Sequence, residues 1–515
     1  MTKNKYMALV FLIFSMLCLY IAWSPVFYEH AWKGHDYFVH VNRAYSTLNE
    51  LSQGQFPPYF DWEYKDYPGY SSNLFYPPLS NYIITLLLYI SLSPDDSVRF
   101  YAVVIIFISL ATFFFSIKSV GVNSLRAAIL SVGFASSIYV VNNIFTRTAF
   151  PESLAVCFIP LLIAGLYHGD YAKKIFLISS SMTLILLSNI PAALCASVLC
   201  FLHVILKKEI KVFIVSAIIC LCLSMFFIFP LAYSMHDQGF SIVDTNWFGV
   251  MSYKKIGLYD LISGESSVDG PLKGMALGLG WPITFLLLMT IIKERKVSWE
   301  VYSILILSFV VISGANYNFL PNLMSSLSKI QFTWRFIPYI LTITLFYIGI
   351  KSHATNKTMM LSFIACAVMA SSVSAVKINS GNVTLESVKK VKFVDYVLTG
   401  RKENEVIRCE KDGVVYYPKF DFHREGGNNV VYSFNSYAGS WCSLPAMAYN
   451  SFSVKDLEYK TRDGMFIIKT KKEKTNATLK LKDSFRISMI FSYALSIISL
   501  FAMLVYLAIF RKRNI

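Results

Sequence analysis

The chain is a succession of apolar stretches, each long enough to cross a lipid bilayer as a helix. A spanning helix needs about 20 mostly apolar residues. Only 15% of the 515 residues are charged, whereas a soluble domain has about 25%. The sequence therefore predicts a polytopic membrane protein, with twelve candidate spans: 7–23, 98–118, 126–143, 152–168, 174–190, 191–206, 211–234, 273–292, 299–314, 334–351, 357–376 and 486–510.

A thirteenth apolar stretch, 78–92, is short and is followed by Ser-Pro-Asp-Asp at 93–96. Short basic clusters mark cytoplasmic loops. If the N-terminus lies inside and 78–92 is an interfacial or re-entrant helix, the basic clusters between the spans all become cytoplasmic. If 78–92 crosses instead, the next cluster falls on the wrong side. We therefore interpret the formal net charge of +16 as a topology signal and not as a sign of a nucleic-acid partner.

This topology has about twelve crossings with both ends inside. It leaves four segments outside, namely 24–97, 144–151, 235–272 and 377–485. Because the outer loops are long and the inner loops short, polar catalytic residues have room only at the outer face. No nucleoside triphosphate is available there, so a reaction on that side has to use a substrate delivered in the membrane.

The last outer segment, 377–485, alternates between apolar and polar residues as β-strands do. It predicts a small extracytoplasmic all-β domain between a transmembrane domain (1–376, with the first outer loop 24–97) and a final span with a basic tail (486–515). Cys409 and Cys442 are the two cysteines of this segment and can pair outside the cytoplasm. The other seven cysteines lie in apolar runs, where small buried residues are expected.

Polar residues recur with helical spacing in the first outer loop. Asp36, His40, Arg43 and Thr47 stand at i, i+4, i+7 and i+11, which places them on one helix face. Asp36 could act as a general base on an acceptor hydroxyl, and Arg43 could hold a phosphate. Two alternatives remain open: an ion pair or solvated polar face, and a metal site formed by His35, Asp36 and His40.

An aromatic, proline-rich stretch follows in the same loop, at 54–60, 69–70 and 73–79. Such a loop can stack against a sugar, or it can form an aromatic belt at the membrane interface. The sequence leaves both interpretations open.

Three further ionisable residues lie at the outer ends of predicted spans. Arg147 and Glu152 occupy the short link 144–151 and the start of the next span, and Arg335 begins the span 334–351 in the context Gln331-Phe-Thr-Trp334-Arg335. Ionisable residues at such positions are candidates for function. For Arg335 a lipid phosphate is one partner, and a Trp/Arg interfacial anchor is the alternative.

Taken together, these pieces resemble the polytopic glycosyltransferases of GT-C architecture. They are most similar to the bacterial membrane proteins labelled as 6-pyruvoyl-tetrahydropterin synthase-related, and glucosyltransferases that modify O-antigen have a similar size and layout. The matching motifs run through most of the chain in order: His35-Asp36 with His40 and Arg43, Gly54-Gln-Phe-Pro, Phe75-Tyr76-Pro-Pro-Leu, Arg147 with Glu152, Ser188-Asn-Ile-Pro, Gln331-Phe-Thr-Trp-Arg, and a β domain before a last span.

The resemblance implies transfer of a sugar from a polyprenyl-phosphate carrier to a cell-surface glycan or glycolipid, such as O-antigen. The reaction would occur at the periplasmic face of a bacterial inner membrane. Asp36 would act as the base and Glu152 as a second catalytic acid, without a certain cofactor but with a divalent metal as an option. The implied substrate-binding residues are His35, His40, Arg43, Tyr76, Arg147, Gln331, Trp334 and Arg335.

Two other classes of protein compete with the enzyme. A transporter or flippase for lipid-linked glycans predicts ionisable residues at mid-membrane, and the spans contain almost none. A non-catalytic assembly factor would use the β domain as a binding module. For this rival, loss of the β domain abolishes function, whereas Asp36→Asn leaves it intact.

Overall fold

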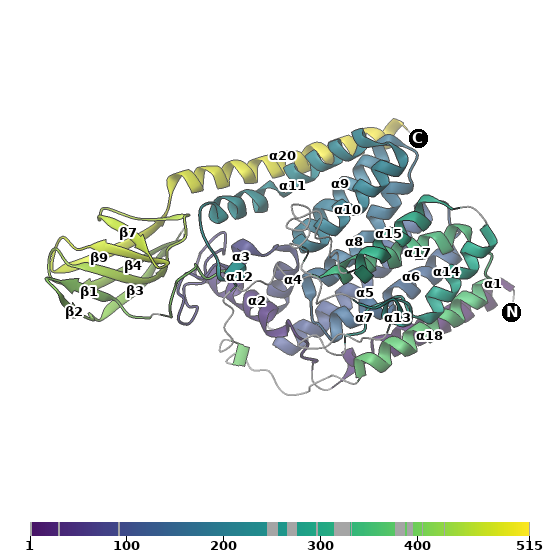
Figure 1. Cartoon of the computed structure of the whole chain (residues 1–515), viewed down its shortest axis with the longest axis horizontal. Helices are drawn as coiled ribbons and strands as arrows, with labels where there is room; N and C mark the ends of the chain where they lie inside the picture. Colours follow the sequence, from purple (N-terminus) through teal and green to yellow (C-terminus); the bar gives the residue numbers. More distant parts are fainter. Residues whose placement is uncertain are drawn as a thin grey trace. The chain divides into compact units, whose positions relative to one another are not determined.

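The computed structural model divides into two compact units. It describes residues 3–28, 31–90, 93–244, 256–264, 275–294, 297–313, 330, 332–375, 387–388, 395–403, 405–426 and 428–513. The helical unit comprises 1–40, 91–220 and 248–384, and the mixed unit comprises 41–90, 221–247 and 385–515. Each unit is described below by itself (Figure 1).

The helical unit is a bundle of apolar helices. Its most deeply buried members are α8 and α17: the apolar window of α8 is 89% buried, and that of Thr333–Lys351 is 94% buried. These two helices therefore form the centre of the bundle. Its helices are α1 (Lys3–Ala22), η1 (Ser24–Phe27), α5 (Pro94–Ser119), α6 (Ser124–Ala135), α7 (Ile138–Phe145), α8 (Phe150–Tyr167), α9 (Tyr171–Ser188), α10 (Ile190–Lys207), α13 (Leu258–Ser263), α14 (Trp281–Glu294), α15 (Trp299–Ser313), η4 (Thr333–Phe336), α17 (Ile337–Lys351) and α18 (Asn356–Ala375).

Eight helical stretches in the described part of the chain are long and apolar enough to cross a membrane. The prediction of a polytopic helical membrane protein is confirmed at this level, whereas the number of twelve crossings stays a prediction. Two expected spans are short helices: α14 has 14 residues and α15 has 15. The eight stretches are Pro94–Ser119, Ser124–Phe145, Phe150–Tyr167, Tyr171–Ser188, Ile190–Lys207, Ile210–Met235, Thr333–Lys351 and Asp483–Tyr506.

The stretch predicted as one helix over 126–143 is interrupted by two serines. Ser136 ends α6, and Ser137 is extended, with ψ 152°. The Ser137 hydroxyl donates to the carbonyl of Phe134 at 2.7 Å. Serine side chains compete with the helix for backbone groups in this way. As a result α7 is a separate eight-residue helix that leads directly into the loop carrying Arg147.

The mixed unit combines short helices of the first loop with most of one long apolar helix, α11, and the whole of another, α20. Its helices are α2 (Tyr37–Ser52), which begins in the helical unit, α3 (Ser72–Phe75), α4 (Leu79–Tyr89), α11 (Ile210–Met235), which also begins in the helical unit, α12 (Ser241–Asp244) and α20 (Asp483–Arg513). With 11 residues, α4 is about 16 Å long. It is too short to cross the about 30 Å of hydrocarbon in a bilayer.

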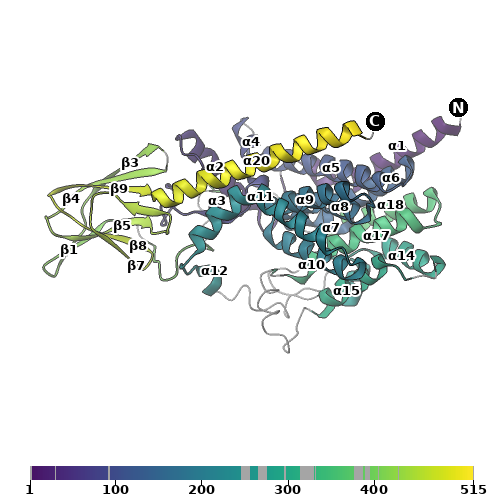
Figure 2. The ribbon, with the colours of Figure 1, turned by 90° about the horizontal axis from the view of Figure 1, so that it is seen from above.

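The last helix, α20, runs beside the second half of α11 (Figures 1 and 2). The Ser496 hydroxyl donates to the carbonyl of Cys222 at 3.0 Å and accepts from the N–H of Phe226 at 3.1 Å. Both hydrogen bonds use a serine inside an apolar helix. They fix the register between the two helices.

Before α20 the chain forms two antiparallel sheets. One has the strand order β2-β1-β5-β8-β7, and the other has the order β3-β4-β9-β6. The predicted all-β character of this region is thus confirmed. The strands are β1 (Arg408–Lys411), β2 (Val414–Tyr416), β3 (Phe420–Gly426), β4 (Asn429–Asn435), β5 (Trp441–Met447), β6 (Phe452–Val454), β7 (Tyr459–Arg462), β8 (Met465–Lys469) and β9 (Lys474–Leu481).

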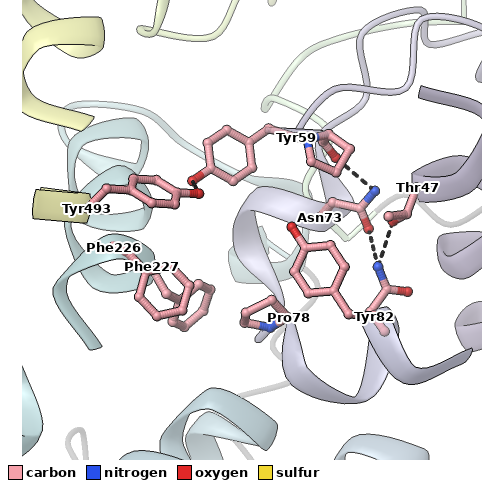
Figure 3. A pocket seen from close by; sticks show the side chains of 10 residues that line it. Thr47, Tyr59, Asn73, Pro78, Tyr82, Phe226, Phe227 and Tyr493 are labelled. Atoms are coloured by element: carbon pink, nitrogen blue, oxygen red, sulfur yellow. Dashed lines mark hydrogen bonds between the residues drawn. The ribbon is translucent and has the colours of Figure 1, made fainter. Parts of the chain in front are cut away.

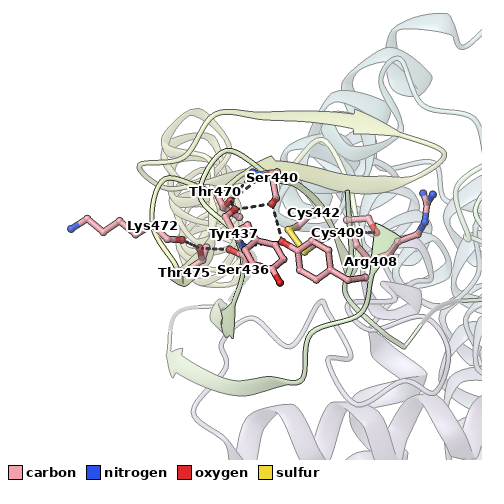
Figure 4. Close-up of a disulfide and its surroundings, with 11 residues drawn as sticks. Arg408, Cys409, Ser436, Tyr437, Ser440, Cys442, Thr470, Lys472 and Thr475 are labelled. Carbon is pink, nitrogen blue, oxygen red and sulfur yellow. Dashed lines mark hydrogen bonds between the residues drawn. A yellow bond between two sulfur atoms is a disulfide. The ribbon is translucent and has the colours of Figure 1, made fainter. Parts of the chain in front are cut away.

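A disulfide joins the neighbouring strands β1 and β5 (Figure 4). Cys409 and Cys442 are directly opposite in the ladder and are bonded, with both side chains buried. Six of the seven other cysteines are buried free thiols, and Cys222 is half-buried. The disulfide therefore closes a loop of 33 residues that contains β2, β3 and β4.

Within the mixed unit, α2 is tied to the β region by a buried carboxylate. Glu50 is fully buried, and it accepts from the guanidinium of Arg424 on β3 at 3.1 Å and from the N–H of Trp62 at 3.2 Å. The same guanidinium also bonds Glu63 at 3.0 Å. The first loop and the β sheets are therefore held together by side-chain hydrogen bonds as well as by packing.

Candidate functional site

Asp36 is positioned by hydrogen bonds between two chain segments of the helical unit, 34–36 and 146–148. We call this set of contacts the interlock. The N–H of Gly34 donates to the Thr148 hydroxyl at 2.9 Å, and the N–H of Asp36 donates to the carbonyl of Arg147 at 2.9 Å. A third bond, at 3.3 Å, runs from the N–H of His35 to the carbonyl of Thr146. The segment 34–36 therefore lies directly against the loop 146–148.

The interlock depends on an unusually close backbone approach. A Cβ atom on Gly34 would lie 2.2 Å from the Thr148 hydroxyl, 2.6 Å from the carbonyl oxygen of Thr146 and 2.8 Å from the carbonyl carbon of Arg147. Thr148 has φ +54°, a left-handed conformation that is costly for a β-branched residue. This strained loop keeps its shape because the surrounding contacts hold it.

At the start of α8, Glu152 binds three side chains at once. Its Oε1 accepts from the Tyr139 hydroxyl at 2.7 Å and from the Arg147 guanidinium at 2.7 Å. Its Oε2 accepts from Nε of Arg335 at 3.1 Å. Because Glu152 is only 2% exposed, these are charge-assisted hydrogen bonds largely shielded from water. We call Tyr139, Arg147, Glu152 and Arg335 the Glu152 cluster.

Both guanidinium groups have further anchors. Arg147 donates to the side-chain oxygen of Asn143 at 2.6 Å, and Arg335 donates to the carbonyl of Ile330 at 2.6 Å. The Arg335 guanidinium also lies 4.9 Å from the ring centre of Phe332. The cluster thus fixes the orientation of two cations that come from distant parts of the chain.

The charges of the cluster do not cancel. It contains two guanidinium groups and one carboxylate, and Asp36 lies close enough to Arg147 to interact with it electrostatically. Burial alone would lower the pKa of Arg147, but Glu152 and Asp36 more than offset burial and raise it above its usual value. Arg147 therefore stays charged, and its positive charge is balanced by Asp36 as well as by Glu152.

The structure brings some of the other predicted residues close to this cluster. The His40 ring lies 5.8 Å from the ring of Phe150 at the start of α8, whereas His35 is exposed. Trp334 is fully buried and stacks on Phe332 at 4.3 Å, so it supports the Arg335 segment. Gln331 lies outside the described residues.

Two predicted binding residues, Arg43 and Tyr76, belong to the mixed unit. The Arg43 guanidinium lies 4.6 Å from the ring centre of Tyr76, and the Tyr76 hydroxyl donates to Asp395 at 3.0 Å. Burial lowers the pKa of Arg43 to about 10. Because Arg43 is only 3% exposed and Thr47 is fully buried, the alternative of a solvated polar face is wrong.

The aromatic, proline-rich loop contributes to a cleft in the mixed unit (Figure 3). The Tyr59 and Tyr493 hydroxyls are 3.1 Å apart, and the Asn81 amide donates to Thr47 at 2.6 Å and to Asn73 at 3.3 Å. No charged side chain lines this cleft, so it cannot hold a phosphate by ion pairing. The lining residues are Thr47, Pro58, Tyr59, Asn73, Pro78, Asn81, Tyr82, Phe226, Phe227 and Tyr493.

The sequence reasoning missed four residues that shape the site: Gly34, Tyr139, Asn143 and Thr148. Asn143 precedes Arg147 by four residues, a spacing that brings side chains together on a helix. Gly34 directly precedes the His35-Asp36 pair. Among the described residues, no group of three or more His, Cys, Asp or Glu side chains is arranged to hold a metal ion, so the metal alternative has no structural support.

These observations define a class: a multi-helix membrane protein with a charged cluster at the start of a central helix and a disulfide-bonded β region before its last helix. The chain is 24% identical over 271 residues to an uncharacterized protein of Lactococcus lactis subsp. cremoris (strain MG1363). The similarity covers 48% of this chain and 44% of the relative, so the chain spans less than half of that protein's length. No family model and no solved structure match the chain.

Proposed function

We propose that the protein is a glycosyltransferase that moves a sugar from a polyprenyl-phosphate carrier to a cell-surface glycan or glycolipid, such as O-antigen. The observation that carries this proposal is the pair of guanidinium groups clamped by Glu152, next to the segment that bears Asp36. Guanidinium groups bind phosphate with two parallel hydrogen bonds, and a carboxylate can accept the proton of an attacking hydroxyl. The site thus has a carboxylate that can accept the proton of the acceptor hydroxyl and two guanidinium groups that can bind the phosphate of the donor.

In the proposed step, Asp36 takes the proton of an acceptor hydroxyl while the oxygen attacks the anomeric carbon. A new carbon–oxygen bond forms, and the bond between that carbon and the phosphate oxygen breaks. The departing polyprenyl phosphate keeps the bonding electrons, and Arg147 and Arg335 stabilise its negative charge. A single displacement of this kind inverts the configuration of the sugar.

We assign Glu152 a different role from the one that the resemblance implied. Both of its carboxylate oxygens are already occupied by hydrogen bonds, and its side chain is buried. A carboxylate tied to two cations is a poor proton acceptor. We therefore assign Glu152 as a positioning residue that holds Arg147 and Arg335, and Asp36 as the base.

The proposal includes a bacterial inner-membrane location, about twelve crossings and a site that faces the periplasm. The positions of the basic clusters support this sidedness. The disulfide supports an oxidising compartment for the β region. The bacterial origin of the relative agrees with a bacterial source.

The test uses the purified protein in lipid nanodiscs with a polyprenyl-phosphate sugar and a glycolipid acceptor. We expect turnover that falls about 100- to 10,000-fold in Asp36→Asn, since a general base contributes that much. Asp463→Asn, at an exposed position of the β region, is the matched control and should keep full activity. Full activity in Asp36→Asn would remove this residue as the base, and an inactive wild-type protein with every lipid-linked sugar would oppose the proposed function.

A further inference from the structure

The outer face of the five-stranded sheet has a tryptophan at its centre. Cys409 and Cys442 point into the buried side of the sheet, so their neighbours along the strands point outward. Arg408 and Glu410 on β1 therefore lie on the same outer face as Trp441 and Ser443 on β5. Trp441 is half-buried there, between β1 and β8.

The register of the next strands places two lysines whose ammonium groups lie over this ring. Lys469 on β8 is directly opposite Trp441, and Lys460 on β7 is opposite the outward residue Ile467. The ammonium groups of Lys460 and Lys469 lie 4.5 and 5.6 Å from the centre of the Trp441 ring. Arg462, opposite Met465, extends the same face. We call Arg408, Trp441, Lys460, Arg462 and Lys469 the Trp441 platform.

The cations of the platform are not neutralised strongly. Arg408 contacts Glu410, Arg462 contacts Asp463, and Lys469 contacts Glu458, each at 3.6 Å. Because these side chains are 45–76% exposed, water and salt screen the pairs. Among the described residues, no carboxylate lies within ion-pair distance of Lys460. Four cations thus meet three carboxylates, and the cation in excess is Lys460 beside Trp441.

We infer that the Trp441 platform binds a negatively charged glycan. An indole ring offers a flat surface against which a sugar ring can stack, and the flanking ammonium and guanidinium groups complement the carboxylates or phosphates of an acidic sugar. An anionic membrane is the competing partner for such a face. Proteins insert exposed apolar side chains into membranes, but Trp441, Met465 and Ile467 are only half exposed, and the long cations surround them. The face thus presents charged side chains over and beside the ring rather than a continuous apolar surface, which fits an anionic glycan better than a bilayer.

The platform gives the proposed transferase a place to hold its acceptor outside the reaction centre. That assignment of the glycan as acceptor rests on the proposed function, whereas binding by the platform does not. The binding experiment can therefore use the Asp36→Asn variant, in which no transfer is expected.

The experiment measures binding of tetragalacturonate, an acidic oligosaccharide, and maltotetraose, a neutral one, by calorimetry. The full-length Asp36→Asn protein is held in phosphatidylcholine nanodiscs. We expect tetragalacturonate to bind more tightly than maltotetraose. We also expect its affinity to fall as salt is added, because salt screens exposed charges. Trp441→Ala and Lys460→Glu should each weaken tetragalacturonate binding about tenfold.

Tyr437→Ala is the matched control, because Tyr437 is 62% exposed and also lies near a lysine, Lys411, at 5.9 Å, but in the loop before β5. It should bind tetragalacturonate as the parent does. Lys460→Glu keeps the tryptophan, so it tests the platform even if Trp441→Ala fails to fold. Equal affinity of all variants, equal affinity for the neutral probe, or capture of phosphatidylglycerol vesicles without oligosaccharide binding would each overturn the inference.

Discussion

At the scale of single residues, one buried carboxylate of the helical unit binds two arginines. Glu152 accepts hydrogen bonds from Tyr139, Arg147 and Arg335, and all four residues are buried. Buried charges are tolerated only when they are paired and hydrogen-bonded. The stability of this region and the orientation of the two arginines therefore depend on the same residue.

Glu152→Gln should destabilise the protein and reduce activity together. The amide keeps the size of the side chain but removes the carboxylate that pairs with two buried guanidinium groups, a loss of about 3–5 kcal/mol. Thermal unfolding in detergent measures the effect. Glu410→Gln, at an exposed position, is the control and should unfold at the wild-type temperature. An unchanged unfolding temperature in Glu152→Gln would mean that the cluster contributes little to the fold.

Gly34→Ala should damage the interlock that holds Asp36. The new methyl group would collide with the backbone of the loop 146–148, and overpacking of this kind costs about 1–3 kcal/mol. We expect a lower unfolding temperature and a loss of turnover. Gly169→Ala is the matched control, since a Cβ there has no atom within 4 Å. If both alanine variants behave alike, the close approach at Gly34 is not important.

The sequence indicated the charged members of the site better than the neutral ones. Arg147, Glu152 and Arg335 stand out because they are ionisable residues at the outer ends of predicted spans. Tyr139 and Asn143 lie inside an apolar run, and nothing local marks them. Their roles come from tertiary contacts, which one sequence does not reveal.

At the scale of elements, the β region depends on its disulfide. We expect Cys409→Ser with Cys442→Ser to lower the stability of this region by about 2–4 kcal/mol, because the loop between them is freed in the unfolded chain. Limited proteolysis of the full-length protein measures the change. Cys222→Ser, which removes a free thiol outside the sheets, should leave the cleavage rate unchanged. If the protease cleaves the double variant no faster than the wild type, the expectation is contradicted.

The contact between α2 and β3 should make stability depend on pH. Burial raises the pKa of Glu50 from 4.5 to about 8, although Arg424 lowers it in part, and burial raises the pKa of Asp61 to about 6. An acid with a raised pKa in the folded state favours folding while it is protonated. This contribution is complete below about pH 4.5 for Glu50 and is lost as the pH rises through about 8.

Unfolding temperatures measured between pH 5 and 8 should therefore fall more steeply for the wild type than for Glu50→Gln. The amide cannot ionise, so it removes the Glu50 part of the dependence. Glu458→Gln, which changes an exposed carboxylate of the β region, should keep the wild-type slope. Parallel slopes for wild type and Glu50→Gln would show that Glu50 does not titrate in this range.

Elements were predictable wherever hydropathy or alternation is strong. The apolar helices and the strands of the β region follow those patterns. The break between α6 and α7 was missed because Ser136 and Ser137 lie in a continuous apolar run. The effect of a serine on a helix depends on which backbone carbonyl accepts a hydrogen bond from its hydroxyl. Hydropathy does not report which carbonyl that is.

At the scale of the whole molecule, the proposed topology predicts which segments of the chain face the cytoplasm and which face outward. A cysteine introduced at Lys118, in the last turn of α5, should react with a membrane-impermeant maleimide only after the membrane is opened. A cysteine at Lys455 in the β region should react in intact cells. The wild-type protein gives the background, since its free cysteines are buried or half-buried. Labelling of the Lys118 position from outside would invert the proposed topology.

The Glu152 cluster also has a consequence for how the protein is made. Arg147 precedes Glu152 by five residues, but Arg335 follows it by 183. At about 5–20 residues per second, the ribosome needs about 10–40 seconds to synthesise the segment between Glu152 and Arg335. Until Arg335 has been made, Arg147 is the one arginine of the cluster that can pair with Glu152. The complete Glu152 cluster therefore cannot form before η4, which carries Arg335, has been synthesised.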